Sequence, residues 1–340
     1  MTSENLSFAE ITRILNEMPG PDTVSQSATQ VREQTLTKPA GALGRLEEIS
    51  AWLATWQRRH PPQVTHPRVA VFAGNHGVVA QGVSAYPAHV TAQMVANFNA
   101  GGAAVNQLCR NADADLRVYE MNLAQPVHDF TQKSAMSEEE CVHALAYGMM
   151  AVEPGIDLLA VGEMGIGNSC AAAALCLALF GGDASDWTGH GTGINETQLM
   201  HKQKIVAAGG KRHHAHHGQP LALLADIGGR EFAAMIGAII AARYAGVPVI
   251  LDGFASTAAA AVLYAISPDY LDHCIVSHCS AERGHRKLLE TIGKIPLFNF
   301  NMRLGEASGA ALVIPIIRAA ALCHSGMASF AEANVAGKSP

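Results

Sequence analysis

The stretch IDLLAVGEMGIGNSCAAAALCLALF, residues 156–180, contains the pattern that decides the fold. Its first six residues are apolar apart from Asp157, which is typical of a strand buried on both faces. A glycine-rich turn follows at 162–168, and the alanine-rich run from Cys170 to Phe180 then predicts a buried helix. Strand, turn and helix in this order are the repeating unit of a parallel sheet.

The same unit recurs along the chain from Pro67 onward. Short apolar runs predict four further strands, at residues 68–73, 116–121, 247–251 and 274–277. Alanine-rich segments of helical character lie between them. We therefore predict an α/β fold, with a parallel sheet flanked by helices on both faces.

The two most apolar regions, 171–180 and 232–251, do not predict a membrane span. The first is too short, and Arg243 and Pro248 interrupt the second. Both are typical of buried core segments.

The first sixty residues differ from the rest of the chain. Apolar residues recur at helical spacing in the stretches 6–15 and 46–56, and no strand pattern is present. We expect residues 1–60 to form a helical small-domain segment, joined by a C-terminal helix at about 324–340. Residues 61–323 are then expected to form the α/β domain that carries the site.

Charge and cysteine content narrow the class of protein. The 340 residues include 23 Lys and Arg against 29 Asp and Glu, a net charge of −6, without a basic cluster that could follow a nucleic-acid backbone. The seven cysteines are odd in number and never spaced as CxxC, which favours a reducing compartment. The stretch MTSENLSFAE at 1–10 is polar and acidic, unlike a secretory signal. We expect a cytoplasmic protein that does not bind nucleic acid.

Glycine and small polar residues follow four of the predicted strands, at 74–77, 162–168, 252–253 and 278–280. In an open parallel sheet, ligands bind outside the carboxyl ends of the strands. A binding crevice is therefore expected along this edge.

The turn at 162–168 places several glycine N–H groups before a helix, where an anion is favoured. It suits a single phosphate better than a dinucleotide, because Gly165-x-Gly167-x-x-Cys170 lacks the third glycine of the dinucleotide fingerprint. A simple turn is the alternative interpretation.

A second glycine cluster, Gly189-His190-Gly191-Thr192-Gly193, precedes a helix that contains Lys202. Alternating glycines let a backbone approach a ligand closely, and the lysine ammonium suits a phosphate. An exposed loop with a solvated lysine is an equally good interpretation of these residues alone.

Three further polar residues have two interpretations each. Glu306 precedes the apolar helical stretch 310–321, so it is as compatible with helix capping as with catalysis. Asp252 fits a turn after its strand, and Ser280 fits a helix N-cap.

The histidine run at 213–217 raises the question of a metal site. No carboxylate or cysteine is suitably spaced with it, and Lys211 and Arg212 precede it. A solvated loop is the favoured interpretation.

Taken together, these segments resemble the nicotinate-nucleotide:dimethylbenzimidazole phosphoribosyltransferases of cobalamin biosynthesis. The similar segments are KPAGALGRLE (38–47), AGNHGV (73–78), GVS (82–84), GEMGIGN (162–168), GTG (191–193), LDGF (251–254) and LGE (304–306). They occur in the family's order along nearly the whole chain, and the ordered set is far more specific than any one motif.

The resemblance implies a Rossmann-like sheet with a smaller helical domain, in a homodimer without metal or cofactor. It also implies transfer of the phosphoribosyl group of nicotinate mononucleotide to 5,6-dimethylbenzimidazole or a related base, giving α-ribazole 5′-phosphate and nicotinate. By resemblance, Glu306 is the catalytic base and Glu163 is a second catalytic carboxylate, near the ribose.

The resemblance also implies two sets of binding residues. Phosphate and ribose contacts are implied for Gly165, Gly167, Asn168, Gly191, Thr192, Gly193, Lys202, Asp252 and Ser280. Contacts to the aromatic base are implied for Ser84, Tyr86, Gln93, Met94 and Leu304. The sequence does not distinguish which flat aromatic base is used.

Two other classes stay open on the residues alone. The alternation of strands and helices also fits a nicotinamide-cofactor oxidoreductase, although the GxGxxG turn and its following acidic residue are missing. The other class is a non-catalytic protein that binds a base or a nucleotide. The two glutamates, Glu163 and Glu306, argue against it.

Overall fold

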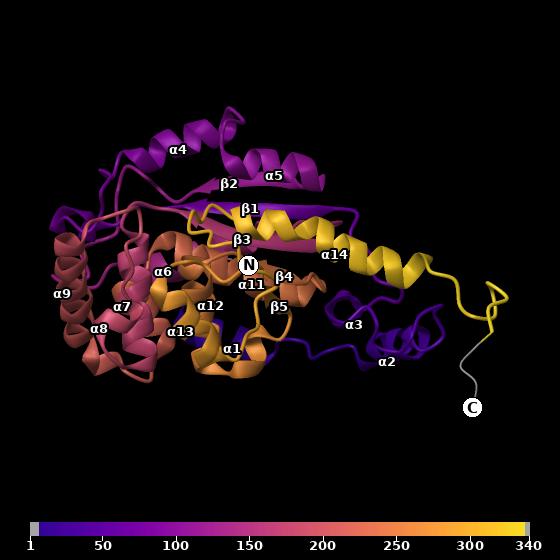
Figure 1. Ribbon diagram of the computed structural model, residues 1–340. Helices are drawn as coiled ribbons and strands as arrows, with labels where there is room; N and C mark the ends of the chain where they lie inside the picture. The colour runs from indigo at the N-terminus through magenta and orange to yellow at the C-terminus, as the bar shows by residue number, and fades with distance from the viewer. Residues whose placement is uncertain (1–6, 337–340) are drawn as a thin grey trace.

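The computed structural model describes residues 7–336. Five strands of this part of the chain form one sheet, in the order β2-β1-β3-β4-β5, and every neighbouring pair is parallel (Figure 1). The strands are β1 (Pro67–Ala73), β2 (Asp115–Glu120), β3 (Leu158–Met164), β4 (Val249–Leu251) and β5 (Cys274–Val276). The predicted parallel α/β sheet is confirmed, with strand ends within three residues of those expected.

The largest difference in strand bounds concerns β3. It runs on to Met164, so Gly162 and Glu163 belong to the strand and not to the predicted turn. They stay extended because the register with β1 continues, with Gly162 opposite Val71 and Glu163 opposite Phe72. Glu163 is therefore held by a central strand, which is more rigid than a loop.

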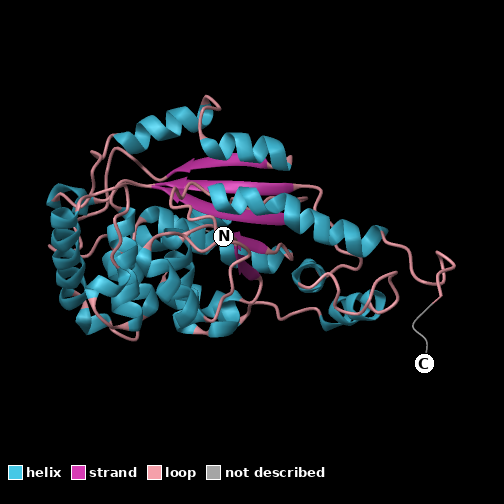
Figure 2. Ribbon diagram, viewed as in Figure 1, coloured by secondary structure: helices cyan, strands magenta, loops and turns pink. Residues whose placement is uncertain are grey.

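Helices surround the sheet, and Figure 2 shows them on both of its faces. They are α1 (Phe8–Asn16), α2 (Thr23–Glu33), α3 (Arg45–Gln57), α4 (Val90–Asn99), α5 (Ala104–Ala112), α6 (Glu138–Met149), α7 (Asn168–Phe180), α8 (Ala184–Trp187), α9 (Glu196–Arg212), α10 (Pro220–Ile227), α11 (Arg230–Ala245), α12 (Phe254–Ile266), α13 (Arg283–Ile292) and α14 (Ser308–Gly326).

The side chains of β1 point alternately to the two faces of the sheet, and each face has its own hydrophobic core. Val69, Val71 and Ala73 pack with residues of α3, α4, α5 and α14, whereas Ala70 and Phe72 pack with residues of α6, α7, α10, α11 and α12. Side chains on a strand alternate between the two faces, so one strand contributes to both cores. Burial on both faces explains why the strands read as nearly continuous apolar runs.

The strand order reverses between β1 and β3. Strands β2 and β1 extend the sheet on one side of that point, and β3, β4 and β5 extend it on the other. Beyond the strand ends, the two following loops meet, because Gly74 N–H donates to the Met164 carbonyl at 3.0 Å. Such a reversal leaves a crevice at the carboxyl ends of the strands.

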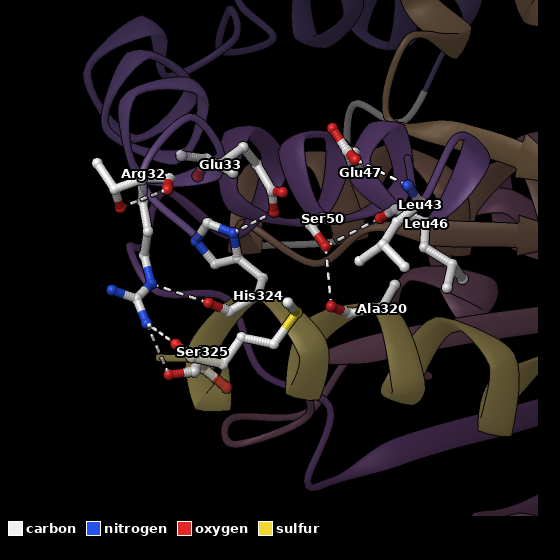
Figure 3. Close-up of polar contacts among 12 residues, drawn as sticks. Arg32, Glu33, Leu43, Leu46, Glu47, Ser50, Ala320, His324 and Ser325 are labelled. Atoms are coloured by element: carbon white, nitrogen blue, oxygen red, sulfur yellow. Dashed lines mark hydrogen bonds and ion pairs between the residues drawn. The ribbon is translucent and has the colours of Figure 1, made fainter. Parts of the chain in front are cut away.

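Helices α2 and α3 pack against the far end of α14 (Figure 3). Ser50 of α3 donates to the Ala320 carbonyl at 2.9 Å, and Arg32 of α2 donates to the His324 carbonyl at 2.8 Å. Helix α1 lies elsewhere, against α6, where Ile11 and Leu15 join the other core. The division of the chain into 1–60 and 61–323 remains a prediction, and residues 1–6 lie outside the described part.

The C-terminal helix expected at about 324–340 is wrong in position. Helix α14 already ends at Gly326, and residues 327–336 form turns and irregular chain. Their backbone bonds to the segment after α2 instead: Thr37 N–H donates to the Ala328 carbonyl at 3.1 Å, and Phe330 N–H donates to the Thr35 carbonyl at 2.9 Å. Residues 337–340 lie outside the described part.

One helix of the described chain, α14, is long and apolar enough to cross a membrane by length and composition alone. Half of it is buried inside the molecule. Buried core helices of soluble proteins pass the same test, so this helix is weak evidence for a span.

Candidate active site

A cavity of about 650 Å³ opens at the carboxyl ends of the strands. Its wall brings together many residues that the sequence singled out: Tyr86, Met94, Glu163, Gly165, Asn168, Gly191, Thr192, Ser280, Leu304 and Glu306. Segments 220 positions apart in the chain thus meet at the edge of the sheet where the strand-end pattern predicted a crevice.

The loop before α14 holds Glu306 in place through an unusual backbone. Gly305, Glu306 and Ala307 all have positive φ, at 77°, 60° and 57°. Only glycine adopts this region without strain, so the fold must hold the other two residues there. The Glu306 N–H donates to the Glu163 carbonyl at 3.1 Å, which fixes the loop to the end of β3.

Gly162 makes this close approach of loop and strand possible. A Cβ at this position would lie 2.2 Å from the Ala307 nitrogen, closer than any real contact. The absence of a side chain on β3 therefore lets the 305–307 loop rest directly on the strand. As a result, the two glutamates lie on adjacent backbone segments of the same wall.

Burial governs the charge of Glu306. The residue is only 6% exposed, and burial raises the pKa of its carboxyl to about 7. A carboxyl with this pKa is ionised in about half of the molecules at neutral pH, so it can both accept and release a proton.

Glu163 and Asp252 form a second buried acidic layer beside it. Burial raises the pKa of Glu163 to about 8, and the nearby carboxylates of Asp252 and Glu231 add to the rise. Burial also raises the pKa of Asp252 to about 7, although backbone N–H groups of Ala310 and Gly309 partly offset this. Like charges this close cannot all ionise together at neutral pH.

Asp252 does not lie on the cavity wall. Its Oδ1 accepts the Ala310 N–H at 2.9 Å, at the first turn of α14. Among the described residues, His278 is a potential cation at 3.9 Å, but burial lowers its pKa to about 4 and keeps it neutral. Asp252 therefore anchors α14, and nothing here places it in contact with a ligand.

Lys202 lies just behind the wall, with 1% of its surface exposed. Its Nζ donates to Ser169 Oγ at 2.9 Å and to the Gly189 carbonyl at 3.2 Å. Burial lowers the pKa of this ammonium. An ammonium has three N–H donors, so the third is available to an anion that reaches the wall at Ser169 and Gly191.

The glycine cluster at 189–193 reaches the cavity wall at Gly191 and Thr192 and is bonded to three other segments. Gly191 N–H donates to Glu282 Oε1 at 2.9 Å, and the Gly191 carbonyl accepts from Arg303 Nη1 at 2.8 Å. Thr192 Oγ1 lies 3.2 Å from Ser84 Oγ. The cluster is a largely exposed loop, as the alternative interpretation held, but these hydrogen bonds tie it to its neighbours. The solvated lysine of that interpretation is wrong, because Lys202 is buried.

An apolar side of the cavity is formed by Tyr86, Val90, Met94 and Leu304. Tyr86 and Leu304 are about half exposed, at 51% and 54%, so this side opens to solvent. Exposed aromatic and aliphatic side chains around a cavity suit a flat apolar ligand.

Four other predicted binding residues do not line the cavity. Gln93 is exposed on α4, and Ser84 contacts Thr192 instead of the interior. Gly167 has φ 95° and packs against Val79, and Gly193 has φ 103°, so both shape their loops. The sequence could not separate such positions from their neighbours because exposure depends on how the loops pack.

Among the wall residues that the sequence reasoning missed, three have polar side chains: Ser169, Glu282 and Arg303. Each stands within two positions of a residue that was named. Proximity to Asn168, Ser280 and Leu304 was the only signal available for them.

The histidine run is a mostly solvated loop, as predicted: residues 214–217 are exposed, and only His213 is buried. Asp226 lies 3.2 Å from His213 Nδ1 and 2.5 Å from His216 Nδ1, and its other oxygen accepts from Ser134 at 2.6 Å. The carboxylate comes from α10, close in sequence but not at a metal-ligand spacing. Within the described residues, no cluster suited to holding a metal ion is found.

Comparison with known proteins agrees with this geometry. A family model described as "Phosphoribosyltransferase" matches residues 18–335. The chain belongs to this phosphoribosyltransferase family. The nicotinamide-cofactor oxidoreductases, the alternative raised by the sequence, are a different class.

Relatives are similar over nearly the full length. The nicotinate-nucleotide–dimethylbenzimidazole phosphoribosyltransferases of Brucella anthropi and Brucella canis are each 53% identical, covering 99% and 98% of this chain and 99% of their own. A crystal structure of the phosphoribosyltransferase of the same name from Thermus thermophilus is 39% identical, with a TM-score of 0.86. It covers 92% of this chain and 99% of its own. The likeness thus includes both the sheet and the site loops.

Proposed function

We propose that this protein transfers the phosphoribosyl group of nicotinate mononucleotide to 5,6-dimethylbenzimidazole or a related base, giving α-ribazole 5′-phosphate and nicotinate for the nucleotide loop of cobalamin. Relatives of that name support the substrates. The observation that carries the proposal is the pair of buried glutamates, Glu163 and Glu306, fixed to one another by their backbones in a cavity with an apolar side.

The reaction exchanges one C–N bond for another at the anomeric carbon of the ribose. The bond from this carbon to the nicotinate nitrogen breaks, and its electron pair leaves with a neutral pyridine ring. A benzimidazole nitrogen forms the new bond from the opposite face, which inverts the carbon to the α configuration. The proton on the other benzimidazole nitrogen must then be accepted by a base.

Glu306 is our candidate for that base. Its carboxyl lines the cavity next to Leu304, and its pKa of about 7 matches a proton acceptor that works at neutral pH. A positioned general base contributes about 10²- to 10⁴-fold to a rate.

Glu163 is our candidate for stabilising the sugar. Positive charge develops on the ribose as the first bond weakens, as it does in glycoside hydrolysis, and an ionised carboxylate beside it lowers the barrier. Glu163 lies on the wall of the cavity with its backbone fixed in β3.

The mononucleotide phosphate is proposed to bind where Gly165, Gly191, Ser280 and the buried Lys202 converge. Gly165 and Gly191 offer backbone close to the wall, and Lys202 supplies charge. The aromatic base is proposed to lie against Tyr86, Met94 and Leu304 on the apolar side. We assign no ligand contact to Ser84, Gln93, Gly167, Gly193 or Asp252.

A cytoplasmic location and a homodimer are also proposals. The described cysteines are all free, which supports a reducing compartment. A biosynthetic role with small-molecule substrates is consistent with the same location.

Product analysis tests the function directly. The purified protein is incubated with nicotinate mononucleotide and dimethylbenzimidazole, and the products are identified by mass spectrometry. We expect α-ribazole phosphate and nicotinate in equal amounts, and neither when one substrate is left out. Release of nicotinate without ribotide would point to a hydrolase and overturn the proposal.

A further inference from the structure

A buried histidine–glutamate pair lies beneath the site, outside the cavity wall. His76 follows β1, and Glu231 stands in the first turn of α11. Glu231 is fully buried, His76 is 2% exposed, and His76 Nε2 lies 2.5 Å from Glu231 Oε1. Neither residue lines the cavity, so neither touches a substrate there.

Glycines bring the pair close to the two loops of the site. A Cβ on Gly74 would lie 2.2 Å from Glu231 Oε2, and one on Gly229 would lie 2.4 Å from the same oxygen. Likewise, a Cβ on Gly165 would lie 2.5 Å from the Gly74 carbonyl. Glu231, the loop after β1 and the loop after β3 are therefore stacked in direct contact, at the point where the strand order reverses.

One hydrogen bond joins the two side chains of the pair. Glu231 Oε2 and His76 Nδ1 are both buried without a hydrogen-bond partner among the described residues. The contact between His76 Nε2 and Glu231 Oε1 is therefore what orients the Glu231 carboxyl.

Glu231 in turn acts on Glu163. Glu163 faces Asp252 from the end of β4, Glu306 from the loop before α14 and Glu231 from α11, and the neutral Asn168 of α7 donates to it. The three acidic neighbours all favour its protonated form. Glu306 lies on the cavity wall, and Asp252 accepts a backbone N–H from α14. Glu231 does neither.

We propose that Glu231 is a positioning residue for the reaction: oriented by its hydrogen bond with His76, it supports the two strand-end loops and places a fixed negative charge behind Glu163. This inference rests on the proposed function. Its consequence is that Glu231 sets the pH at which Glu163 loses its proton and the site becomes active. His76 acts only through Glu231, as the hydrogen-bond partner that orients its carboxyl.

The pH dependence of ribotide formation tests this proposal. In the wild type, kcat should rise with pH until Glu163 is ionised. Replacing Glu231 by glutamine removes the fixed charge, so the midpoint of this rise should move down by about 0.5–1 pH unit. For each protein, the rate at pH 6.5 is divided by its own plateau rate at high pH. This fraction should be about 3- to 10-fold larger for the variant than for the wild type.

Two changes at His76 separate charge from packing. H76Q retains an N–H donor and should keep the wild-type midpoint. H76F fills the space without a donor, so Glu231 loses the hydrogen bond that holds its carboxyl behind Glu163, and the midpoint should fall as in E231Q. These two variants keep the proposal testable if E231Q does not fold.

Asp226→Asn is the matched control. Asp226 is also a buried carboxylate bonded to histidine, on the neighbouring helix α10, but it lies away from the cavity. D226N should lower the melting temperature and leave the midpoint of the profile unchanged.

The possible results have distinct meanings. The proposal is overturned if E231Q and H76F leave the midpoint unchanged. It is also overturned if D226N shifts the midpoint as far as they do. Absence of ribotide with the wild type, which is measured first, counts against the proposed function itself.

Discussion

Buried charges lie near both ends of α14, but they are arranged in opposite ways. At the far end, Lys38 Nζ lies 2.9 Å from Glu33 Oε2 and 2.8 Å from Glu47 Oε1, and His324 Nδ1 lies 2.6 Å from Glu33 Oε1 (Figure 3 shows the Glu33–His324 contact). At the near end, Glu163, Asp252 and Glu306 are gathered without a cation to pair with them among the described residues.

The pKa values follow this difference. Burial disfavours the charged form of Glu47, but hydrogen bonds from Lys38 and Leu43 outweigh it and lower its pKa. For Glu306, burial acts alone and raises the pKa to about 7. Paired buried charges hold a fold together, whereas unpaired ones cost stability and keep a proton available near neutral pH. One helix thus joins a stabilising region to a reactive one.

Breaking the pairing at the far end should have the largest effect on stability. Replacing Lys38 by methionine leaves two partly buried carboxylates without the ammonium that they share, which should lower the free energy of unfolding by about 2–3 kcal/mol. Urea denaturation measures this change. The rate per folded molecule should stay normal, and a variant as stable as the wild type would show that the cluster contributes nothing.

Removing a carboxyl group at the near end should increase the stability of the fold at high pH. The pKa of Glu163 is raised from 4.5 to about 8 by folding, so between these values the folded state holds a proton that the unfolded chain has lost. Raising the pH through this window therefore destabilises the fold. E163Q should be about 1–2 kcal/mol more stable than the wild type at pH 9 and similar at pH 5.

Melting curves at pH 5 and pH 9 measure this effect. A variant that is less stable than the wild type at both values would show that Glu163 is a structural carboxylate, like those of the far end.

Loss of a neutral hydrogen bond at the far end should have a smaller effect on stability than loss of the ion pairs. Ser50 Oγ is buried and donates to the Ala320 carbonyl, so S50A should cost about 0.5–1.5 kcal/mol. Thermal unfolding of S50A beside K38M compares a neutral hydrogen bond with an ion pair. An equal loss in both would mean that charge adds nothing there.

The sequence predicted the sheet well because its signals are local. Apolar runs such as 68–73 and 274–277 end at glycine or polar turns, and both became strands within a residue of their expected ends. It also predicted that Glu163 and Ser280 lie at one edge of the sheet, because parallel strands put all their carboxyl ends together. Glu306 follows no strand, and only the family resemblance implied its place in the site.

Other features depend on contacts between distant segments. The positive φ of Glu306 and Ala307 follows from packing on Gly162, more than 140 positions away. The pairing of Asp226 with His216 and of Glu231 with His76 likewise leaves no pattern in the chain. The end of α14 at Gly326 is set by hydrogen bonds to residues 35–37, which helical periodicity does not reveal.

The most direct test of the central claim is the rate of ribotide formation by E306Q, at saturating concentrations of both substrates. The glutamine has the same size and retains the backbone contact to Glu163, but it cannot accept a proton. We predict a fall in kcat of about 10²- to 10⁴-fold with a normal melting temperature. A kcat within threefold of the wild type would contradict the assignment of Glu306 as the base.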